Sequence, residues 1–297
     1  MAAATSPQTE HLHPQAKGLD QRGSGEILSA LLSGQQQALT AISGALPQIA
    51  AGADLMAEAI RRGRRIHYAA AGSSGLMSLA DCAELPGTFG ISPGQLNIAM
   101  AGGIPTGAEM PGSTEDDAAA GLAAAATVQP ADAVIAVSAS GSTPFPLAFA
   151  TRARSIGARI ICIANNADAA LFGQADAAIH LPTPPEVIAG STRMGAGTAQ
   201  KAALNMMSTL MGIRLGHVVD GMMVNVVADN EKLLRRAAGI VSAITGAAEE
   251  QARACLQDAK GSVKAAILLA SGADGPQQAN ELLEQENGQL RAAMARL

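Results

Sequence analysis

Short apolar segments that alternate with helical stretches constrain the fold of this chain most strongly. The first, "RRIHYAAAG" at residues 64–72, ends in glycine and is followed by the helix-like "GLMSLADCAEL". Because each later segment is almost continuously apolar, we expect strands that are buried on both faces of a parallel sheet. Further strands are predicted at 96–102, 133–139, 158–164 and 177–181, with helices at 115–127, 144–156 and 168–173. This alternation predicts an α/β fold, a three-layer α/β/α sandwich with a parallel sheet.

The segments on either side of this pattern differ in composition. Residues 1–23 are polar and indicate an N-terminal arm, and residues 24–63 predict two helices that are interrupted near Gly44 and Pro47. From about residue 197 we predict no strand, only a long apolar helix and several short ones. We therefore expect three parts: the arm at 1–23, the α/β domain at 24–235 and a small helical C-terminal subdomain at 236–297.

Composition argues against several classes of function. The net charge is -5, and the chain has no Trp, one Tyr and four Phe, which does not favour a nucleic-acid-binding face. No apolar run approaches the roughly 18 residues of a membrane span, and no signal peptide is recognised. Three widely spaced cysteines and five histidines without metal-ligand spacing favour a reducing compartment and no metal or redox cofactor. We expect a cytoplasmic protein.

Two of the predicted strands end in similar loops that are rich in glycine and hydroxyl groups. These loops are "AAAGSSG" at 69–75 and "AVSASGST" at 136–143. Ligands collect at the carboxyl ends of strands in open α/β sheets, and main-chain amides at a helix N-terminus bind phosphate. Ser and Thr before a helix are also ordinary caps, but two such loops in one sheet favour an anion site. The candidate phosphate-binding residues are Ser73, Ser74, Ser138, Ser140, Ser142 and Thr143.

A third polar segment, "GSTRMGAGTAQK" at 190–201, precedes the long helix and lies close in sequence to Glu186. Its simplest interpretation is a capped helix with a surface Arg and Lys. The density of polar groups in an otherwise apolar region favours a ligand-binding role instead. The candidate substrate-binding residues here are Glu186, Ser191, Thr192 and Lys201.

Several motifs resemble those of the N-acetylmuramic acid 6-phosphate etherases, a branch of the sugar isomerase (SIS) domain proteins. They are "GSSG" with "DCAELPGTFG", "STEDD", "SASGSTPF" and above all "PEVIAGSTRMGAGTAQKAALNM". The resemblance extends from about Thr9 to "NGQLRAA" near the end of the chain. It implies a SIS fold and a lyase without a cofactor. That enzyme releases D-lactate from N-acetylmuramic acid 6-phosphate, a phosphorylated amino sugar, and leaves N-acetylglucosamine 6-phosphate in cell-wall recycling.

The resemblance also implies two catalytic carboxylates. Glu84 matches the acid that protonates the departing lactate, and Glu115 in "STEDD" matches a second active-site glutamate, a candidate base at C2. Glu84 lies between a predicted helix and a Pro-Gly turn, where burial among apolar residues would keep its carboxyl group protonated. The alternative is a local capping or pairing role. We interpret the neighbouring acids Asp81, Asp116 and Asp117 as structural or solvated.

The distance between two candidate residues on the helix that follows the first predicted strand indicates a dimer. Ser74 and Glu84 are ten residues apart, which is about 15 Å along a continuous helix and longer than a hexose phosphate. We therefore expect a homodimer in which the active sites are shared between subunits.

The chain departs from the family at two positions that typically carry arginine, Leu76 and Ser142, and its arm has "TEHLHP" where the family usually has "TE-RNP". Loss of two cations would weaken the binding of an anionic substrate, because charge-assisted hydrogen bonds are the stronger ones. Two alternatives therefore stay open. One is a related phosphosugar isomerase or lyase with another substrate, and the other is a non-catalytic sugar-phosphate sensor that binds a regulatory partner. The two glutamates favour an enzyme, whereas the missing arginines favour the sensor.

Overall fold

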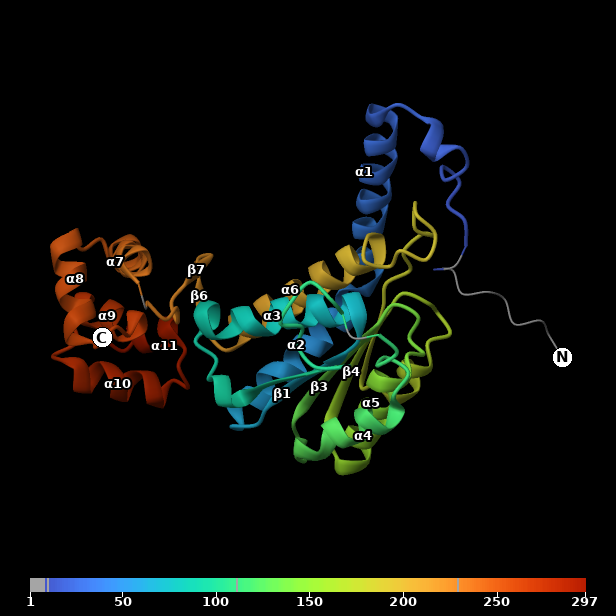
Figure 1. Ribbon diagram of the computed structural model, residues 1–297. Helices are drawn as coiled ribbons and strands as arrows, with labels where there is room; N and C mark the ends of the chain where they lie inside the picture. The colour runs from blue at the N-terminus through green and yellow to red at the C-terminus, as the bar shows by residue number, and fades with distance from the viewer. Residues whose placement is uncertain (1–8, 10, 111, 229) are drawn as a thin grey trace. The chain divides into compact units, whose positions relative to one another are not determined.

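The computed structural model describes residues 9, 11–110, 112–228 and 230–297, and it contains a five-stranded parallel sheet (Figure 1). The strand order is β2-β1-β3-β4-β5, so the direction in which strands are added reverses between β1 and β3. The strands are β1 (Ile66–Ala70), β2 (Leu96–Met100), β3 (Ala133–Ser138), β4 (Arg159–Ala164) and β5 (Ala177–His180). The predicted parallel sheet of an α/β fold is confirmed.

Alternate side chains of the strands pack against helices on the two faces of the sheet. On one face, Ala69 and Val134 belong to a core built around Phe149 of α5 (Pro144–Ile156). On the other face, Ile161 of β4 lies against Gly52 of α2 (Leu46–Arg61). Every residue of β1 and β3 is buried, which explains why these segments are continuously apolar.

Two of the helices predicted between the strands are shorter than expected. The helix predicted at 115–127 is α4 (Ala118–Ala124), continued by the 3-10 helix η5 (Ala125–Thr127), and the one at 168–173 is the 3-10 helix η6 (Ala170–Gln174). The others are η2 (Leu19–Gln21), α1 (Ser24–Thr40), η3 (Ala41–Ala45), η4 (Pro93–Gln95) and α6 (Gly195–Arg214). The two helices predicted before the sheet are α1 and α2, and η3 joins them.

Two expectations about connections are wrong. The Pro-Gly turn predicted after Glu84 does not form, because α3 (Gly72–Phe89) continues through Pro86. A proline removes one helical hydrogen bond, and burial of Leu85 and Phe89 on either side holds the last turns of the helix in place. A strand pair also follows α6, where none was predicted: β6 (Val218–Val219) pairs antiparallel with β7 (Met222–Met223).

The chain divides into two compact units. The first contains the sheet and consists of Met1–Cys82 and Gly94–Ser208, and the second consists of Ala83–Pro93 and Thr209–Leu297. No helix among the described residues is long and apolar enough to cross a membrane.

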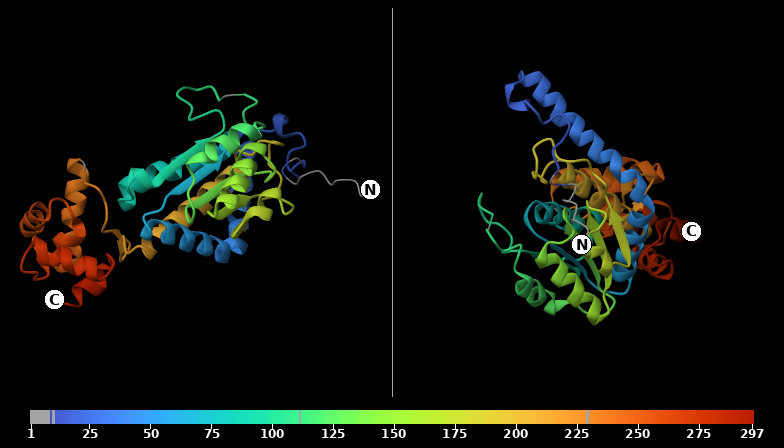
Figure 2. Two further views of the ribbon diagram at one scale, coloured as in Figure 1. Left: turned by 90° about the horizontal axis from the view of Figure 1, so that it is seen from below. Right: turned by 90° about the vertical axis from the view of Figure 1, so that its right-hand side faces the viewer.

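The second unit has a hydrophobic core of its own, which includes Val224, Val241, Leu256 and Ile267. Short helices surround this core, coloured orange to red in Figure 2. They are α7 (Glu231–Thr245), α8 (Glu249–Asp258), α9 (Val263–Ala270), α10 (Pro276–Gln285) and α11 (Leu290–Met294). The predicted helical character of the C-terminal region is confirmed.

Candidate active site

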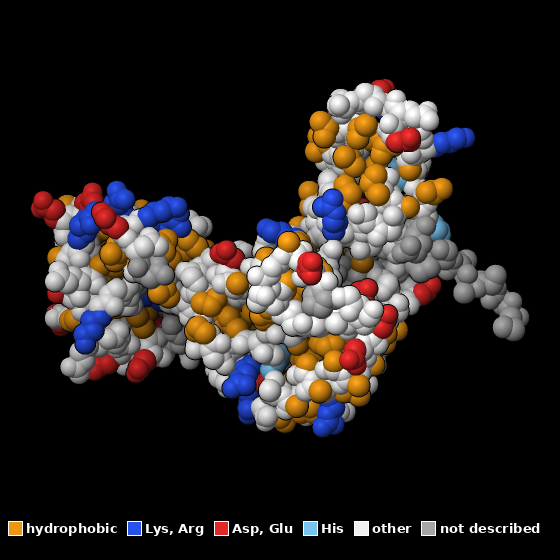
Figure 3. Space-filling model, viewed as in Figure 1, with side chains coloured by type: hydrophobic (Ala, Val, Ile, Leu, Met, Phe, Trp, Pro, Cys, Tyr) orange, Lys and Arg blue, Asp and Glu red, His pale blue; other side chains and the backbone are white. Residues whose placement is uncertain are grey.

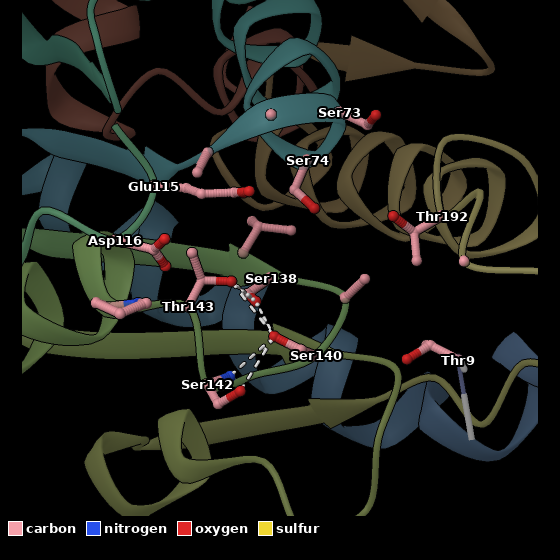
Figure 4. Close-up of a pocket in the computed structure, with 16 residues that line it drawn as sticks. Thr9, Ser73, Ser74, Glu115, Asp116, Ser138, Ser140, Ser142, Thr143 and Thr192 are labelled. Atoms are coloured by element: carbon pink, nitrogen blue, oxygen red, sulfur yellow. Dashed lines mark hydrogen bonds between the residues drawn. The ribbon is translucent and has the colours of Figure 1, made fainter. Parts of the chain in front are cut away.

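A cavity opens at the carboxyl ends of β1 and β3, where the strand order reverses. Open α/β sheets bind their ligands at this position. The cavity has a volume of about 470 Å³, and segments far apart in the sequence line it. Its polar side chains are Thr9, Ser73, Ser74, Glu115, Asp116, Ser138, Ser140, Ser142, Thr143 and Thr192 (Figure 4).

The first serine loop leads directly from β1 into α3. Gly72 has a φ of 51°, a backbone conformation that favours glycine, and it allows the turn that places the N-terminus of α3 at the cavity. Ser74 is 8% exposed, and its hydroxyl group points into the cavity (Figure 4). A helix N-terminus carries partial positive charge, so this wall of the cavity suits an anion.

The second serine loop connects β3 to α5, and its hydroxyl groups hydrogen-bond to one another. Ser138 Oγ lies 2.7 Å from Thr143 Oγ1 and 3.2 Å from Ser140 Oγ, and the amide of Gly141 donates to Ser138 Oγ at 3.0 Å. Gly141 has a φ of 72°, and a Cβ there would lie 2.2 Å from the Cβ of Ala169, so only glycine fits. α5 begins after this loop, so a second helix N-terminus meets the cavity.

The three consecutive acids after β2 take different positions. Glu115 and Asp116 line the cavity, and the Glu115 carboxylate points toward Ser74 (Figure 4). The Asp117 carboxylate instead caps α4 and accepts a hydrogen bond from the amide of Ala120 at 2.8 Å. Asp117 is therefore structural, while Asp116, which was not among the candidate site residues, is exposed and borders the cavity.

The third polar segment brings one of its candidates to the cavity. Thr192 lines it, whereas Ser191 and Lys201 do not. Lys201 is exposed on α6, and its ammonium group donates a hydrogen bond to the side-chain oxygen of Asn205.

Glu186 is buried and does not line the cavity. Its Oε2 accepts a hydrogen bond from the amide of Gly195, and its Oε1 accepts one from the amide of Ala196, each at 2.8 Å. The carboxylate thus satisfies two free amides at the N-terminus of α6. This position corresponds to the capped-helix alternative for this segment.

Glu84 also lies outside the group of residues that line the cavity. Its side chain is exposed on α3, so the expected burial among apolar residues is not found in the single chain. The neighbouring Leu85 is only 1% exposed and occupies the inward-facing position of this turn. Leu76 is exposed on the same helix away from the cavity lining, whereas Ser142 lines the cavity.

Sequence reasoning missed one further lining residue, Thr9 in the N-terminal arm. Its side chain is buried although its neighbours in sequence are polar. The arm carries no periodic pattern, and the only signal for Thr9 in the sequence is that the family resemblance begins at about this residue.

A buried carboxylate, Asp81, fixes α3 beside the sheet. The hydroxyl group of Tyr68 on β1 donates to Asp81 Oδ2 at 2.8 Å, while Asn205 and Ser208 on α6 donate to Oδ1 at 2.8 and 2.9 Å. Burial and the nearby Asp81 raise the pKa of Tyr68 well above its usual value, so this phenol stays protonated. The cluster ties β1, α3 and α6 together.

Further buried titratable groups in the sheet and on α3 have structural environments. His67 Nε2 lies 2.9 Å from Asp132 Oδ2, and burial lowers the pKa of this imidazole. Burial also raises the pKa of Cys82 to about 11 and that of Cys162 to about 12, which leaves both thiols weakly nucleophilic. Within the described residues, no group of three or more His, Cys, Asp or Glu side chains could hold a metal ion.

Comparisons with known proteins agree with this geometry. The SIS domain family model matches residues 35–165, which include both serine loops and Glu115. A Bacteroides fragilis crystal structure, named as a phosphosugar isomerase involved in capsule formation, superposes with a TM-score of 0.54 at 19% sequence identity. The match covers 67% of this chain and 95% of that one. The fold and the position of the cavity therefore define a SIS-domain protein.

Curated relatives identify the branch within this class. The chain is 41% identical over 291 residues to the N-acetylmuramic acid 6-phosphate etherase of Streptomyces avermitilis, covering 97% of this chain and 93% of the relative. It is 38% identical over 293 residues to the etherase of Deinococcus radiodurans, covering 98% and 96%. The chain belongs to the N-acetylmuramic acid 6-phosphate etherase family, as its motifs predicted.

Proposed function

We propose that this chain is an etherase that releases D-lactate from N-acetylmuramic acid 6-phosphate and leaves N-acetylglucosamine 6-phosphate. Its curated relatives carry that name over nearly the whole chain. The observation that carries the proposal is one cavity in which Glu115 faces two serine loops at helix N-termini. We place the enzyme in the cytoplasm, in the recycling of cell-wall amino sugars.

The phosphate group fits the side of the cavity formed by the two serine loops. The N-termini of α3 and α5 supply partial positive charge there. Among the described residues that line the cavity, none is a lysine or arginine, so neutral donors carry phosphate recognition. The donors assigned to the substrate are the hydroxyl groups of Ser73, Ser74, Ser138, Ser140, Ser142, Thr143 and Thr192.

The reaction needs a base and an acid but no change in oxidation state. Opening of the sugar ring exposes the C1 aldehyde, which acidifies the proton at C2. Glu115 removes this proton, the C3–O bond breaks with its electron pair on the lactyl oxygen, and Glu84 protonates that oxygen. Water then adds at C3 of the new double bond, a proton returns to C2, and the products are lactate and N-acetylglucosamine 6-phosphate.

We further propose a homodimer in which Glu84 serves the cavity of the other subunit. Glu84 is exposed and lies ten residues beyond Ser74 on α3, or about 15 Å along the helix axis. An exposed apolar face supports association, because Leu28, Leu32 and Leu39 lie on one face of α1 and are 65%, 59% and 44% exposed. Figure 3 shows hydrophobic side chains gathered on this helix.

Lactate release from N-acetylmuramic acid 6-phosphate by the purified protein tests the activity. We expect Glu84→Gln and Glu115→Gln each to lower kcat by about 10²- to 10⁴-fold. Glu58→Gln is the matched control, because Glu58 is exposed on α2 and pairs with Arg62 on the surface. Deuterium exchange at C2 separates the two roles: Glu84→Gln should still exchange, whereas Glu115→Gln should not. A folded wild-type protein that releases no lactate would overturn the etherase proposal.

Mixing the two inactive variants tests the shared site. A heterodimer of Glu84→Gln and Glu115→Gln chains would contain one site with both native carboxylates. Random reassociation should therefore restore about a quarter of the wild-type activity. An unchanged loss of activity in a mixture with verified subunit exchange would contradict the sharing of sites.

A further inference from the structure

The N-terminal arm reaches the cavity and places Thr9 in its wall. Thr9 is 5% exposed, and its hydroxyl group faces the cavity from the side away from Glu115 and Asp116 (Figure 4). It lies outside residues 35–165, the part of the chain that matches the SIS domain model. The arm therefore adds a polar group that the matched SIS segment does not contain.

The arm is anchored independently of Thr9. His13 is 6% exposed, and its Nδ1 accepts a hydrogen bond from the amide of Gln15 at 3.1 Å. Leu19 is buried in a small apolar cluster with Ala30 of α1 and Val187. Because Leu19 packs the arm against α1 and Val187 without Thr9, a change confined to the Thr9 hydroxyl group should leave the path of the arm intact.

Asn166, which follows β4, connects Thr9 to the second serine loop. Its Nδ2 lies 3.5 Å from Thr9 Oγ1 and 3.4 Å from the carbonyl oxygens of Ala139 and Ser140. Thr9 accepts in this contact, so its own O–H remains available to donate into the cavity. Asn166 Oδ1 is buried and has no hydrogen-bond partner among the described residues. The side-chain amide of Asn166 is therefore positioned by the hydrogen bonds of its Nδ2 group.

The charge of the cavity makes such a neutral donor important. Glu115 and Asp116 are the charged side chains that line it in the described structure, and both oppose an anion. Hydrogen bonds to a charged group are worth more than those between neutral groups. Each hydroxyl group that donates to the phosphate therefore contributes measurably to affinity.

We propose that Thr9 is a substrate-binding residue that closes the phosphate side of the cavity, and that Asn166 positions it. This proposal rests on the proposed function only in assuming that the cavity takes a sugar phosphate. The arm would thus complete the binding site from outside the SIS segment.

Calorimetric titration with N-acetylglucosamine 6-phosphate tests this without turnover. We expect Thr9→Val, which keeps the shape and removes the hydroxyl group, to raise Kd about tenfold. Thr9→Ser, which retains the hydroxyl group, should bind within about twofold of the wild type. Thr40→Val is the matched control, because that hydroxyl group donates to the carbonyl oxygen of Gln36 on the exposed face of α1. Asn166→Ala should weaken binding in the same direction as Thr9→Val.

Three results would overturn the proposal: wild-type affinity in Thr9→Val, equal weakening in Thr9→Val and Thr9→Ser, or no binding by the wild-type protein. Far-UV circular dichroism and Tm confirm that each variant is folded. Hydroxyl-dependent binding by a protein that releases no lactate would uphold the role of Thr9 while overturning the etherase activity.

Discussion

Carboxylates of similar appearance in the sequence do different work in this chain. Glu115 faces the cavity, Asp117 caps α4, Glu186 caps α6 and Asp81 accepts three hydrogen bonds in the interior. What separates them is the set of donors that the fold brings to each one. For Asp81 these donors come from β1 and α6, whose proximity no local sequence pattern reveals.

The cap at Glu186 predicts a strong effect on stability. Glu186→Ala would leave two buried amides without acceptors, so we expect the free energy of unfolding to fall by about 2–4 kcal/mol. Glu186→Gln keeps one acceptor oxygen but turns an NH₂ group toward the second amide. Its free energy of unfolding should therefore lie between those of the wild type and Glu186→Ala. Urea denaturation measures both, with Glu58→Ala as an exposed control expected within about 0.5 kcal/mol of the wild type. Wild-type stability in Glu186→Ala would refute the capping role.

The buried Lys264 in the second unit should make the free energy of unfolding depend on pH. Burial lowers its pKa from 10.5 to about 8, and its ammonium group donates to the carbonyl oxygen of Gly288 at 2.8 Å. The pKa is lower in the folded than in the unfolded chain, so the unfolded chain binds more protons between these pH values. The free energy of unfolding should therefore rise as the pH increases from about 8 to 10.5. Lys264→Met should flatten this rise in urea titrations, and an identical slope in both proteins would contradict the assignment.

At the scale of elements, the sequence correctly predicted the strands, because each strand corresponds to a continuous apolar run. The five strands agree with their apolar runs to within a few residues because both faces of the sheet are covered. The errors lie where packing overrides a local signal. Pro86 suggested a turn, yet the burial of Leu85 and Phe89 keeps it inside α3, and the hairpin of β6 and β7 is too short to give a period.

Two helical glycines provide a matched test of packing. A Cβ on Gly212 of α6 would lie 2.7 Å from the ring of Phe89, whereas a Cβ on Gly239 of α7 would meet nothing within 4 Å. Gly239→Ala should stabilise the protein by about 0.5–1 kcal/mol through helix propensity, and Gly212→Ala should destabilise it by about 1–3 kcal/mol. Thermal unfolding of the two variants checks this contrast. Equal shifts of the same sign would show that Phe89 does not pack as described.

At the scale of the whole molecule, the compact units do not follow the order of the chain. The second unit combines Ala83–Pro93 with Thr209–Leu297, so its sequence-distant parts form one body. Asn225 donates to the carbonyl oxygen of Phe89 at 2.8 Å and links those parts. The composition along the chain indicates a helical C-terminal region. It does not indicate that the end of α3, which begins the segment Ala83–Pro93, belongs to the same compact unit.

A truncation tests this organisation. A chain that ends at Ser208 would keep Phe89 but lose Gly212 and Asn225, which cover its ring and bind its carbonyl group. We expect this fragment to bind a hydrophobic dye and to aggregate, measured by fluorescence and light scattering against the full-length chain. A soluble fragment without dye binding would show that Ala83–Pro93 does not depend on the C-terminal residues.

The residues that line the cavity were predictable from the sequence only in part. Both serine loops could be found because they repeat one strand-loop-helix pattern, and Glu115 because its motif resembles a family motif. Thr9 could not be found because it reaches the cavity from an arm without periodicity, and Glu186 could not be assigned because its donors lie nine and ten residues further along the chain.

The hydroxyl network of the second serine loop should allow the cavity to bind a phosphate group in either of two protonation states, unlike a site built from lysine and arginine. A hydroxyl group can rotate to donate or to accept, whereas arginine and lysine only donate. The second pKa of a phosphate monoester lies near about 6, so its monoanion, which carries a P–OH donor, and its dianion coexist in mildly acidic solution. In each hydrogen bond among Ser138, Ser140 and Thr143, either hydroxyl group can be the donor. We therefore expect this loop to hold either protonation state of its ligand, so that affinity changes little when the medium acidifies.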